Sequence, residues 1–432
     1  MLKLKGLVCC MMTITIGAGC TGTKEPMNEK TEGDKPVTLT MYQKTAGITD
    51  EEFQEYFVKP VQQKFPQVKL EMVRASTQGN TEQELMVSGT FPDLIYSSNP
   101  GIANFKTLGL VDDLTDTIKK NGLDLNVYDP KAIDSIKQNG EAGQLYALPF
   151  SQNFGALIYN KDLFDKFAVP YPTDGMSWEQ LLELSKKLTR NQDGVQYIGL
   201  DPYAVNLIGS GLSLPFIDPK TNKAMLNNDG WRKVFDLYKQ LFAIPGYVDN
   251  EKSKYQYGVN GFFKDKNVAM FTPWFDTVVG QAGAIQDMKW DLAALPNFKE
   301  AVGTGREFDV HVIMVSNMSK HKELAAQIMQ LVTTSEEVQA KMTKRGRMTV
   351  LNKPEMQKLF AQDIEALKGK QIASVFKSKP GLAHVPTVYD SIASQKLNAA
   401  LKDVALGNKD VNTVIRETEE VTNLAIEAAK GK

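Results

Sequence analysis

Segments that favour β-strands alternate with segments that favour α-helices along most of this chain. Residues 37–43, VTLTMYQ, alternate apolar and polar side chains as a strand does, and the apolar residues that follow, up to Phe65, recur at helical spacing. Residues 177–188 begin with the capping box Ser-Trp-Glu-Gln and continue as an amphipathic helix. This alternation predicts an α/β fold with largely parallel sheets.

The length and charge of the chain restrict its organisation and its partners. A chain of 432 residues exceeds what one ordinary core organises, so we expect two domains. Hydrophobic residues make up 42% and charged residues 23%, as in folded globular proteins. The 50 basic and 51 acidic residues nearly balance, and no long basic run with interleaved aromatics occurs. The surface therefore has no electrostatic preference for nucleic acid, and a small or neutral partner is expected.

The first residues have the pattern of an export signal. Lys3 and Lys5 precede the apolar run 7–16, and small residues follow up to position 19. The apolar run is too short for a finished membrane helix, which needs about 20 residues. We therefore expect residues 1–19 to be a cleaved signal peptide. Residues 20–36 are polar and lack core-forming side chains, so they are expected to form a flexible tether.

All three cysteines, at positions 9, 10 and 20, fall within this N-terminal region, which excludes a disulfide framework elsewhere. The segment that ends at Cys20 resembles the lipobox of bacterial lipoproteins, although Gly17 stands where that motif usually has leucine. The resemblance implies that Cys20 carries a lipid anchor at the outer face of the cell membrane. A plain secretory peptide that happens to contain cysteines is the alternative.

Sequence motifs of enzymes are mostly missing. The chain has no Walker-type glycine-rich run, no Gly-x-Ser-x-Gly, no His-Glu-x-x-His and no Cys-x-x-Cys. His311, His321 and His384 lie far apart in the sequence, and no catalytic role, metal site or cofactor is expected for them. A pair of carboxylates that meets only in space, as in a glycosidase, stays open.

Several segments resemble, in the same order, those of the extracellular solute-binding proteins of carbohydrate ABC importers, the group that includes the maltodextrin-binding proteins. The resemblance covers nearly the whole chain after the tether. The segments that carry it are residues 88–99, SGTFPDLIYSSN; 109–116, GLVDDLTD; 143–164, GQLYALPFSQNFGALIYNKDLF; 177–189, SWEQLLELSKKLT; 264–275, KDKNVAMFTPWF; 291–298, DLAALPNF; 319–339, SKHKELAAQIMQLVTTSEEVQ; and 384–411, HVPTVYDSIASQKLNAALKDVALGNKDV.

This resemblance implies a two-lobed periplasmic-binding-protein-like fold, with a hinge and a ligand cleft between the lobes. The first lobe would comprise residues 37–149 and 297–333, and the second lobe residues 150–296 and 334–432. The polar residues 151–153 interrupt two apolar runs and would then form a crossing strand at the floor of the cleft.

Polar and aromatic residues that follow strands are the candidate ligand contacts, because open α/β sheets bind ligands at such ends. Trp274 matches the sugar-stacking tryptophan of the family, with a core tryptophan as the alternative. Tyr203 resembles a second stacking residue, and Asp201 is either a hydroxyl acceptor or a turn cap. The predicted contacts are Gln43, Lys44, Ser98, Asn99, Gln152, Asn153, Asp201, Tyr203, Trp274, Asp276 and Arg306.

Arg306 and Asp309 lie in a segment that is usually glycine-rich and neutral in the family. An arginine in the cleft would pair with the carboxylate of an acidic sugar in a bidentate manner. A salt bridge to Glu307 or Asp309 would instead make Arg306 purely structural.

Together these features predict a monomeric, membrane-anchored receptor outside the cytoplasm that delivers a sugar or oligosaccharide to an ABC permease without a chemical step. Two alternatives stay open. One is a lipid-anchored, glycan-active enzyme, and the other is a receptor for another solute, such as a polyamine or a metal. The absence of clustered cysteine and histidine weighs against a metal.

Overall fold

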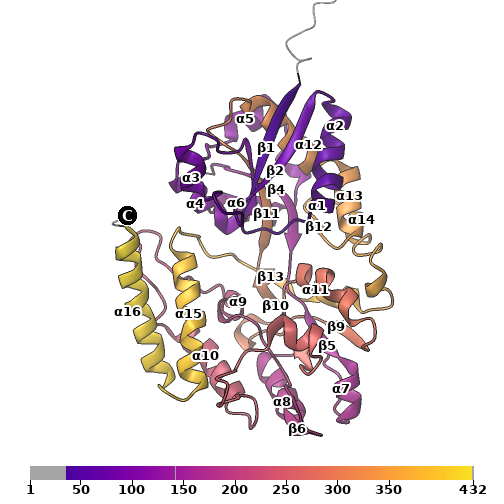
Figure 1. Ribbon diagram of the computed structural model, residues 1–432, viewed down its shortest axis with the longest axis vertical. Coiled ribbons are helices and arrows are strands. Elements are labelled where there is room, and N and C mark those ends of the chain that lie inside the picture. The colour runs from indigo at the N-terminus through magenta and orange to yellow at the C-terminus, as the bar shows by residue number, and fades with distance from the viewer. Residues whose placement is uncertain (1–35, 142, 431–432) are drawn as a thin grey trace, which may run out of the picture.

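The computed structural model describes residues 36–141 and 143–430, which form two lobes along the long axis of the molecule (Figure 1). The expected signal peptide and Cys20 lie outside the described residues. No helix in the described part of the chain is long and apolar enough to cross a membrane.

Lobe 1 is built on a six-stranded sheet with the order β12-β4-β11-β3-β1-β2. β1 pairs in parallel with β2 and β3, whereas β11 runs antiparallel to both β3 and β4. The expectation of largely parallel sheets is therefore correct for β1 to β3. It is wrong for β11, which enters this sheet from the other lobe, for β12, which pairs antiparallel with β4, and for the antiparallel sheet of lobe 2. The strands are β1 (Val37–Gln43), β2 (Val68–Arg74), β3 (Leu94–Ser98), β4 (Leu148–Asn153), β11 (Asp309–Val315) and β12 (Met348–Thr349).

Helices cover this sheet, and a side-chain cap begins the first of them. Thr49 caps it through a capping box with Glu52. The ladder then widens into a π-helical turn, η2 (Gln54–Val58), before Pro60, which has no N–H to donate to the preceding turn. The α-helices of lobe 1 are α1 (Asp50–Phe53), α2 (Lys59–Lys64), α3 (Glu82–Val87), α4 (Ile102–Thr107), α5 (Thr115–Lys120), α6 (Pro130–Lys137), α12 (Lys322–Thr334), α13 (Glu336–Lys344) and α14 (Pro354–Gln357).

Lobe 2 contains a small antiparallel sheet with the order β8-β5-β9. The expected capping box of Ser177 and Gln180 starts its helix α8. Its strands are β5 (Leu157–Asn160), β8 (Met270–Phe271), β9 (Trp290–Ala293) and the hairpin β6 (Arg190–Gln192) with β7 (Val195–Tyr197). Its α-helices are α7 (Lys161–Lys166), α8 (Trp178–Leu188), α9 (Val205–Ser210), α10 (Asp229–Phe242), α11 (Phe275–Gln281), α15 (Asp390–Ala405) and α16 (Val411–Lys430).

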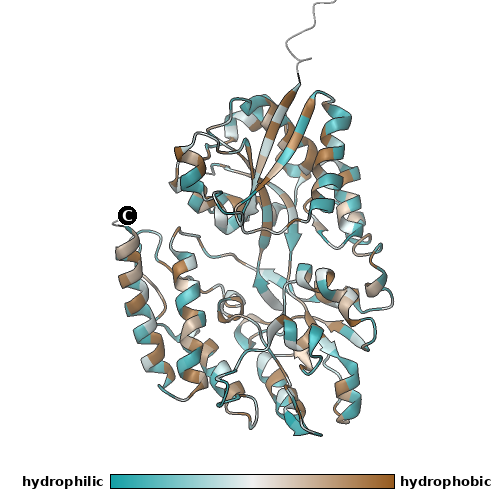
Figure 2. Cartoon of the chain, in the orientation of Figure 1, coloured by the Kyte–Doolittle hydropathy of each residue, from teal (hydrophilic) through white to brown (hydrophobic). Residues whose placement is uncertain are grey.

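Two separate hydrophobic cores show where the chain crosses between the lobes. Phe150 belongs to the core of lobe 1 and Ala156 to the core of lobe 2, so the first crossing lies between them. The chain returns between Phe298 and Phe308, which is later than the expected Asn297. β10 (Thr304–Glu307) lies on this return and pairs in parallel with β13 (Lys379–Gly381). In Figure 2 the strand ends at the crossing are hydrophilic, in contrast to the strand interiors.

The third crossing lies well beyond the expected residues 333–335. Thr333 is buried in lobe 1, where its hydroxyl is 2.8 Å from that of Tyr128. The next helix, α13, also packs on the core of lobe 1 through Val338 and Met342. The apolar faces of α13 and α14 pack on the core of lobe 1, so the chain passes to lobe 2 only between Met356 and Phe360.

Candidate functional site

The sheet of lobe 1 brings four separate segments to one edge. β1, β3 and β4 run in the same direction, so their carboxyl ends meet at the edge that faces lobe 2. Because β11 runs in the opposite direction, its first residue, Asp309, lies beside Asn153 at the end of β4. His311 pairs in the same way with Ser98 at the end of β3. Open α/β sheets bind ligands at such an edge.

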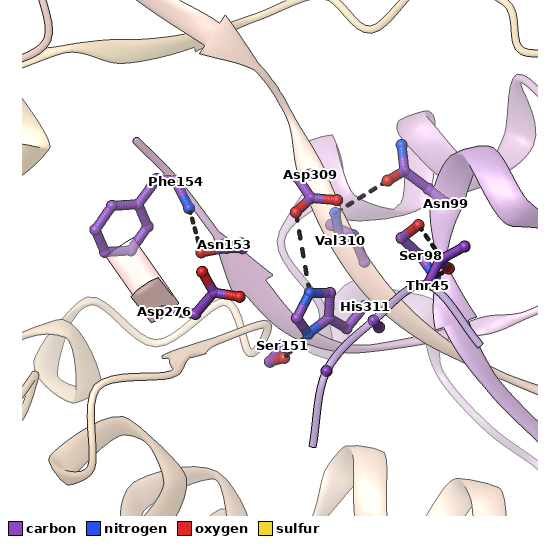
Figure 3. Close-up of polar contacts among 12 residues, drawn as sticks. Thr45, Ser98, Asn99, Ser151, Asn153, Phe154, Asp276, Asp309, Val310 and His311 are labelled. Atoms are coloured by element: carbon purple, nitrogen blue, oxygen red, sulfur yellow. Dashed lines mark hydrogen bonds and ion pairs between the residues drawn. The ribbon is translucent and has the colours of Figure 1, made fainter. Parts of the chain in front are cut away.

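A cavity of about 260 Å³ lies at this edge, with walls from both lobes and from the returning chain. Figure 3 shows its polar side chains converging from β3, β4, β11 and the loop after β1. We call it the Trp274 cavity. Its lining residues are Thr45, Ala46, Gly47, Ser98, Asn99, Pro100, Asn153, Trp274, Asp276, Glu307, Phe308, Asp309 and His311.

Lobe 2 contributes Trp274 and Asp276 to this cavity, at the start of α11. Trp274 follows strand β8 by three residues, after Pro273, and forms an isolated β-bridge with Gly155 on the first crossing. This bridge ties the tryptophan backbone to the floor of the cleft. Trp274 is partly exposed and lines the cavity, so it presents an aromatic surface there.

The polar wall of the cavity is rich in hydrogen-bond acceptors. Burial, together with the nearby Asp276 and Glu307 carboxylates, raises the pKa of Asp309 to about 7. His311 is buried, and burial and the Arg347 guanidinium lower its pKa to about 3, so the ring is neutral. Its Nδ1 is 3.0 Å from the Tyr96 hydroxyl, and its Nε2 is 3.9 Å from an Asp309 oxygen. Carboxylates in such a wall accept hydrogen bonds from ligand hydroxyl or amino groups.

A second cavity, of about 320 Å³, adjoins the first and shares Thr45, Ser98, Pro100 and Glu307 with it. We call it the His384 cavity. The ring of His384 lies between two carboxylates: its Nδ1 is 2.8 Å from Glu307 and its Nε2 is 2.8 Å from Asp390. These carboxylates raise the pKa of His384 to about 10 despite its burial, so the imidazolium is charged. The pair of contacts anchors the segment before α15 against β10.

Several predicted contact residues lie at these cavities. Ser98, Asn99, Asn153, Trp274 and Asp276 line the Trp274 cavity, and Lys44 lines the His384 cavity. The side chain of Asn99 is already engaged, because its Nδ2 donates to the Phe308 carbonyl at 3.3 Å and its Oδ1 accepts from the Val310 N–H at 3.1 Å. Asn99 therefore fastens the returning chain to lobe 1.

Gln43 and Gln152 lie next to the edge but line neither cavity. Gln43 Nε2 donates to the Ala46 carbonyl at 2.6 Å, so it shapes the loop after β1. Gln152 Nε2 donates to Asp129 at 3.1 Å, away from the cleft. The Gln43 amide therefore supports neighbouring backbone, whereas the Gln152 amide holds a carboxylate side chain.

Asp201 and Tyr203 lie outside both cavities, and Asp201 takes the second of its two expected roles. Asp201 is 2% exposed, and its carboxylate accepts hydrogen bonds at 2.7 Å from the backbone N–H groups of Tyr203, Tyr257 and Gly258. Burial raises its pKa. Tyr203 packs against Phe271 and, like Asp201, lines neither cavity. The turn-cap alternative for Asp201 therefore describes its position, and both residues organise the chain beneath the cleft.

Arg306 also departs from the expected direct contact. It is 5% exposed, lines neither cavity, and its guanidinium stacks on the Trp274 ring at 4.9 Å from the centroid. Its Nη2 donates to the carbonyl of Thr272. Because the guanidinium lies behind the indole, it is not placed to pair with a ligand carboxylate.

Four polar lining residues were not among the predicted contacts: Thr45, Glu307, Asp309 and His311. Thr45 directly follows the predicted Lys44 at a strand end, so a wider window would have included it. Asp309 and His311 depend on the reversed direction of β11, which no local pattern reveals, and Glu307 ends β10 just before this strand. Among the described residues, no cluster of three or more potential metal ligands occurs.

A family model described as bacterial extracellular solute-binding protein matches residues 56–367 of this chain. The match covers more than half of the chain, so the protein belongs to this family. Members bind a solute outside the cytoplasm, and the expectation of a binding protein rather than an enzyme is confirmed by this membership.

Solved structures confirm the two-lobed fold over nearly the whole chain. The ABC substrate-binding protein Lmo0181 from Listeria monocytogenes, in complex with cycloalternan, is 19% identical with a TM-score of 0.73, covering 90% of this chain and 99% of that one. The sugar-binding protein MalE from Xanthomonas citri is 15% identical with a TM-score of 0.68, covering 91% and 98%. A cyclo/maltodextrin-binding protein complexed with maltotetraose is 18% identical with a TM-score of 0.67, covering 91% and 98%.

Proposed function

We propose that this protein captures a sugar or oligosaccharide between its lobes and delivers it, as a monomer, to the membrane subunits of an ABC importer. The observation that carries the proposal is the Trp274 cavity, in which an aromatic side chain from lobe 2 lies among hydroxyl and carboxylate groups from lobe 1 and the returning chain. The oligosaccharides bound by solved relatives support the same ligand class.

The chemistry of the cavity matches both parts of a sugar. A pyranose has CH-rich faces, which an indole covers without competing for the hydroxyl groups at the ring edge. Those hydroxyls find partners in the Thr45 and Ser98 hydroxyls and the Asp276 and Asp309 carboxylates. The adjoining His384 cavity offers space for further sugar units along the same cleft.

A screen of purified protein against a glycan array, followed by calorimetry on each hit, tests the proposal. We expect saturable binding of at least one oligosaccharide and recovery of that glycan unchanged. If no glycan binds while a polyamine or another solute raises the melting temperature, the sugar proposal is wrong and the receptor serves another ligand class. Conversion of the glycan would contradict a receptor.

Ligand binding is expected to close the cleft. Each lobe has its own hydrophobic core, and ligand contacts from both walls would stabilise the closed state relative to the open one. Small-angle X-ray scattering with and without a saturating sugar should therefore show a smaller radius of gyration in the complex. Superimposable curves at verified saturation would contradict lobe closure.

We further propose that Cys20 carries a lipid anchor and that the residues up to Pro36 hold the lobes away from the membrane. The support is the signal-like segment that ends at this cysteine. A sixteen-residue flexible tether spans roughly 20 to 25 Å on average. We expect Cys20→Ala to move the protein from the membrane fraction to the soluble fraction and to abolish incorporation of labelled fatty acid. Cys10→Ala is the matched control and should change neither, whereas continued labelling of Cys20→Ala would exclude this anchor.

A further inference from the structure

Trp274 is held from one side by a buried cation. The guanidinium carbon of Arg306 lies 4.9 Å from the centroid of the indole, within the range of a cation–π contact. Arg306 is 5% exposed and lines neither cavity, whereas Trp274 lines the Trp274 cavity. One face of the indole is therefore covered by protein, and the ligand must use the remaining surface.

The guanidinium occupies a close-fitting slot in lobe 2. Its Nη2 donates to the Thr272 carbonyl, and its Nη1 has no hydrogen-bond partner among the described residues. A Cβ atom added at Gly155 would lie 3.0 Å from Nη1 and 2.5 Å from Leu295 Cδ1. Since Gly155 also forms the β-bridge with Trp274, the absence of a side chain at this position lets the arginine reach the ring.

Burying the charge of Arg306 costs free energy, and its single hydrogen bond, to the Thr272 carbonyl, recovers only part of this cost. Burial lowers the pKa of Arg306 to about 10, and it still carries its charge at neutral pH. An arginine that has a buried N–H group without a partner contributes little to the stability of the folded protein. Its contact with the indole is the feature that connects it to the cleft.

We propose that Arg306 is a positioning residue that fixes the indole of Trp274 from behind and so preorganises the opposite face for a sugar ring, without touching the sugar. This proposal rests on the proposed sugar-binding function. A fixed platform loses less conformational freedom when the ligand binds, which increases affinity without an added contact.

The first measurement needs no ligand, so it separates this proposal from the proposed function. Acrylamide quenching of the ligand-free protein reports mainly Trp274, because the other three tryptophans are 0 to 5% exposed. Arg306→Met keeps an apolar stem but removes the cation. We expect Trp274 emission to become more accessible to acrylamide in Arg306→Met than in the wild type, with Trp274→Phe as the baseline for subtraction.

The second measurement is a double-mutant cycle on affinity, with maltotetraose as the first probe and the best glycan of the screen as its replacement. Arg306→Met should weaken binding about fivefold in the wild-type background and have no further effect in Trp274→Ala. Arg306→Lys keeps the charge without the planar stack and should give an intermediate loss. The matched control is Arg190→Met, which removes an arginine stacked on Phe167 at 4.6 Å, a pair that lines neither cavity, and it should leave affinity unchanged.

Two results would overturn the proposal. Equal losses of affinity in the wild-type and Trp274→Ala backgrounds would mean that Arg306 acts on the ligand directly. Unchanged quenching of Trp274 in both Arg306 variants would mean that the cation does not fix the ring. If Arg306→Met fails to fold, Arg306→Lys supplies both measurements, and urea unfolding of each variant identifies the folded samples.

Discussion

Trp274→Ala is expected to weaken sugar binding at least tenfold while the protein remains folded. Stacked aromatic contacts contribute roughly 0.5 to 1.5 kcal/mol beyond the area that they bury, and the lost buried area adds to this. A tenfold change corresponds to about 1.4 kcal/mol. Because the indole is partly exposed at a cavity, its removal should affect the ligand more than the core.

Calorimetry and urea unfolding of the same variant distinguish this role from a structural one. Trp178→Ala is the matched control, because Trp178 is 5% exposed and packs in the core of lobe 2 against Phe298. It should lower the free energy of unfolding by roughly 3 to 5 kcal/mol and leave the affinity of folded protein unchanged. Unchanged affinity of folded Trp274→Ala would remove this residue from the site.

His384→Gln is expected to destabilise the protein by roughly 3 to 5 kcal/mol, because it leaves the carboxylates of Glu307 and Asp390 facing one another without the cation between them. The side chain of His384 is only 6% exposed, so solvent screens the pair weakly. Urea unfolding measures the difference. His321→Gln changes an exposed histidine and should have no effect.

The same contact gives stability a defined pH dependence. The folded pKa of His384, about 10, lies above its ordinary value of 6.5, so the folded state holds a proton that the unfolded state loses. The stabilisation is complete below pH 6.5 and is lost as the pH rises towards 10. His384→Gln should show a shallower decline over this window. Parallel declines of variant and wild type would show that other groups cause the pH dependence.

Much of the fold follows from local patterns. The alternation of strands and helices predicts the α/β class, and the cap at Ser177 forms as its sequence indicates. The two lobes, in contrast, are implied by the resemblance of the segments to those of a known family. The boundaries between the lobes are harder to predict from the sequence. For example, α13 is an ordinary amphipathic helix whose sequence does not indicate which core its apolar face will contact.

Those residues of the candidate site that lie at or just after strand ends could be predicted from the sequence. Ser98 and Asn153 end parallel strands, and Trp274 follows an apolar strand. Asp309 and His311 become neighbours of these residues only through the antiparallel entry of β11. Asp201 and Arg306 were predicted as ligand contacts but line neither cavity. A polar residue near a strand end can instead be buried and contact backbone or another side chain, as these two do.

The position of β11 also constrains the order in which the chain can mature during synthesis. β11 is an interior strand, bonded on one side to β3 and on the other to β4. Residues 37–153 therefore leave the ribosome with two open strand edges that stay unpaired until residue 315 has been made. Lobe 2 in turn waits for α15 and α16, which are made last. Neither lobe can therefore complete its native packing until most of the chain has been made, and the unpaired strand edges stay exposed until then.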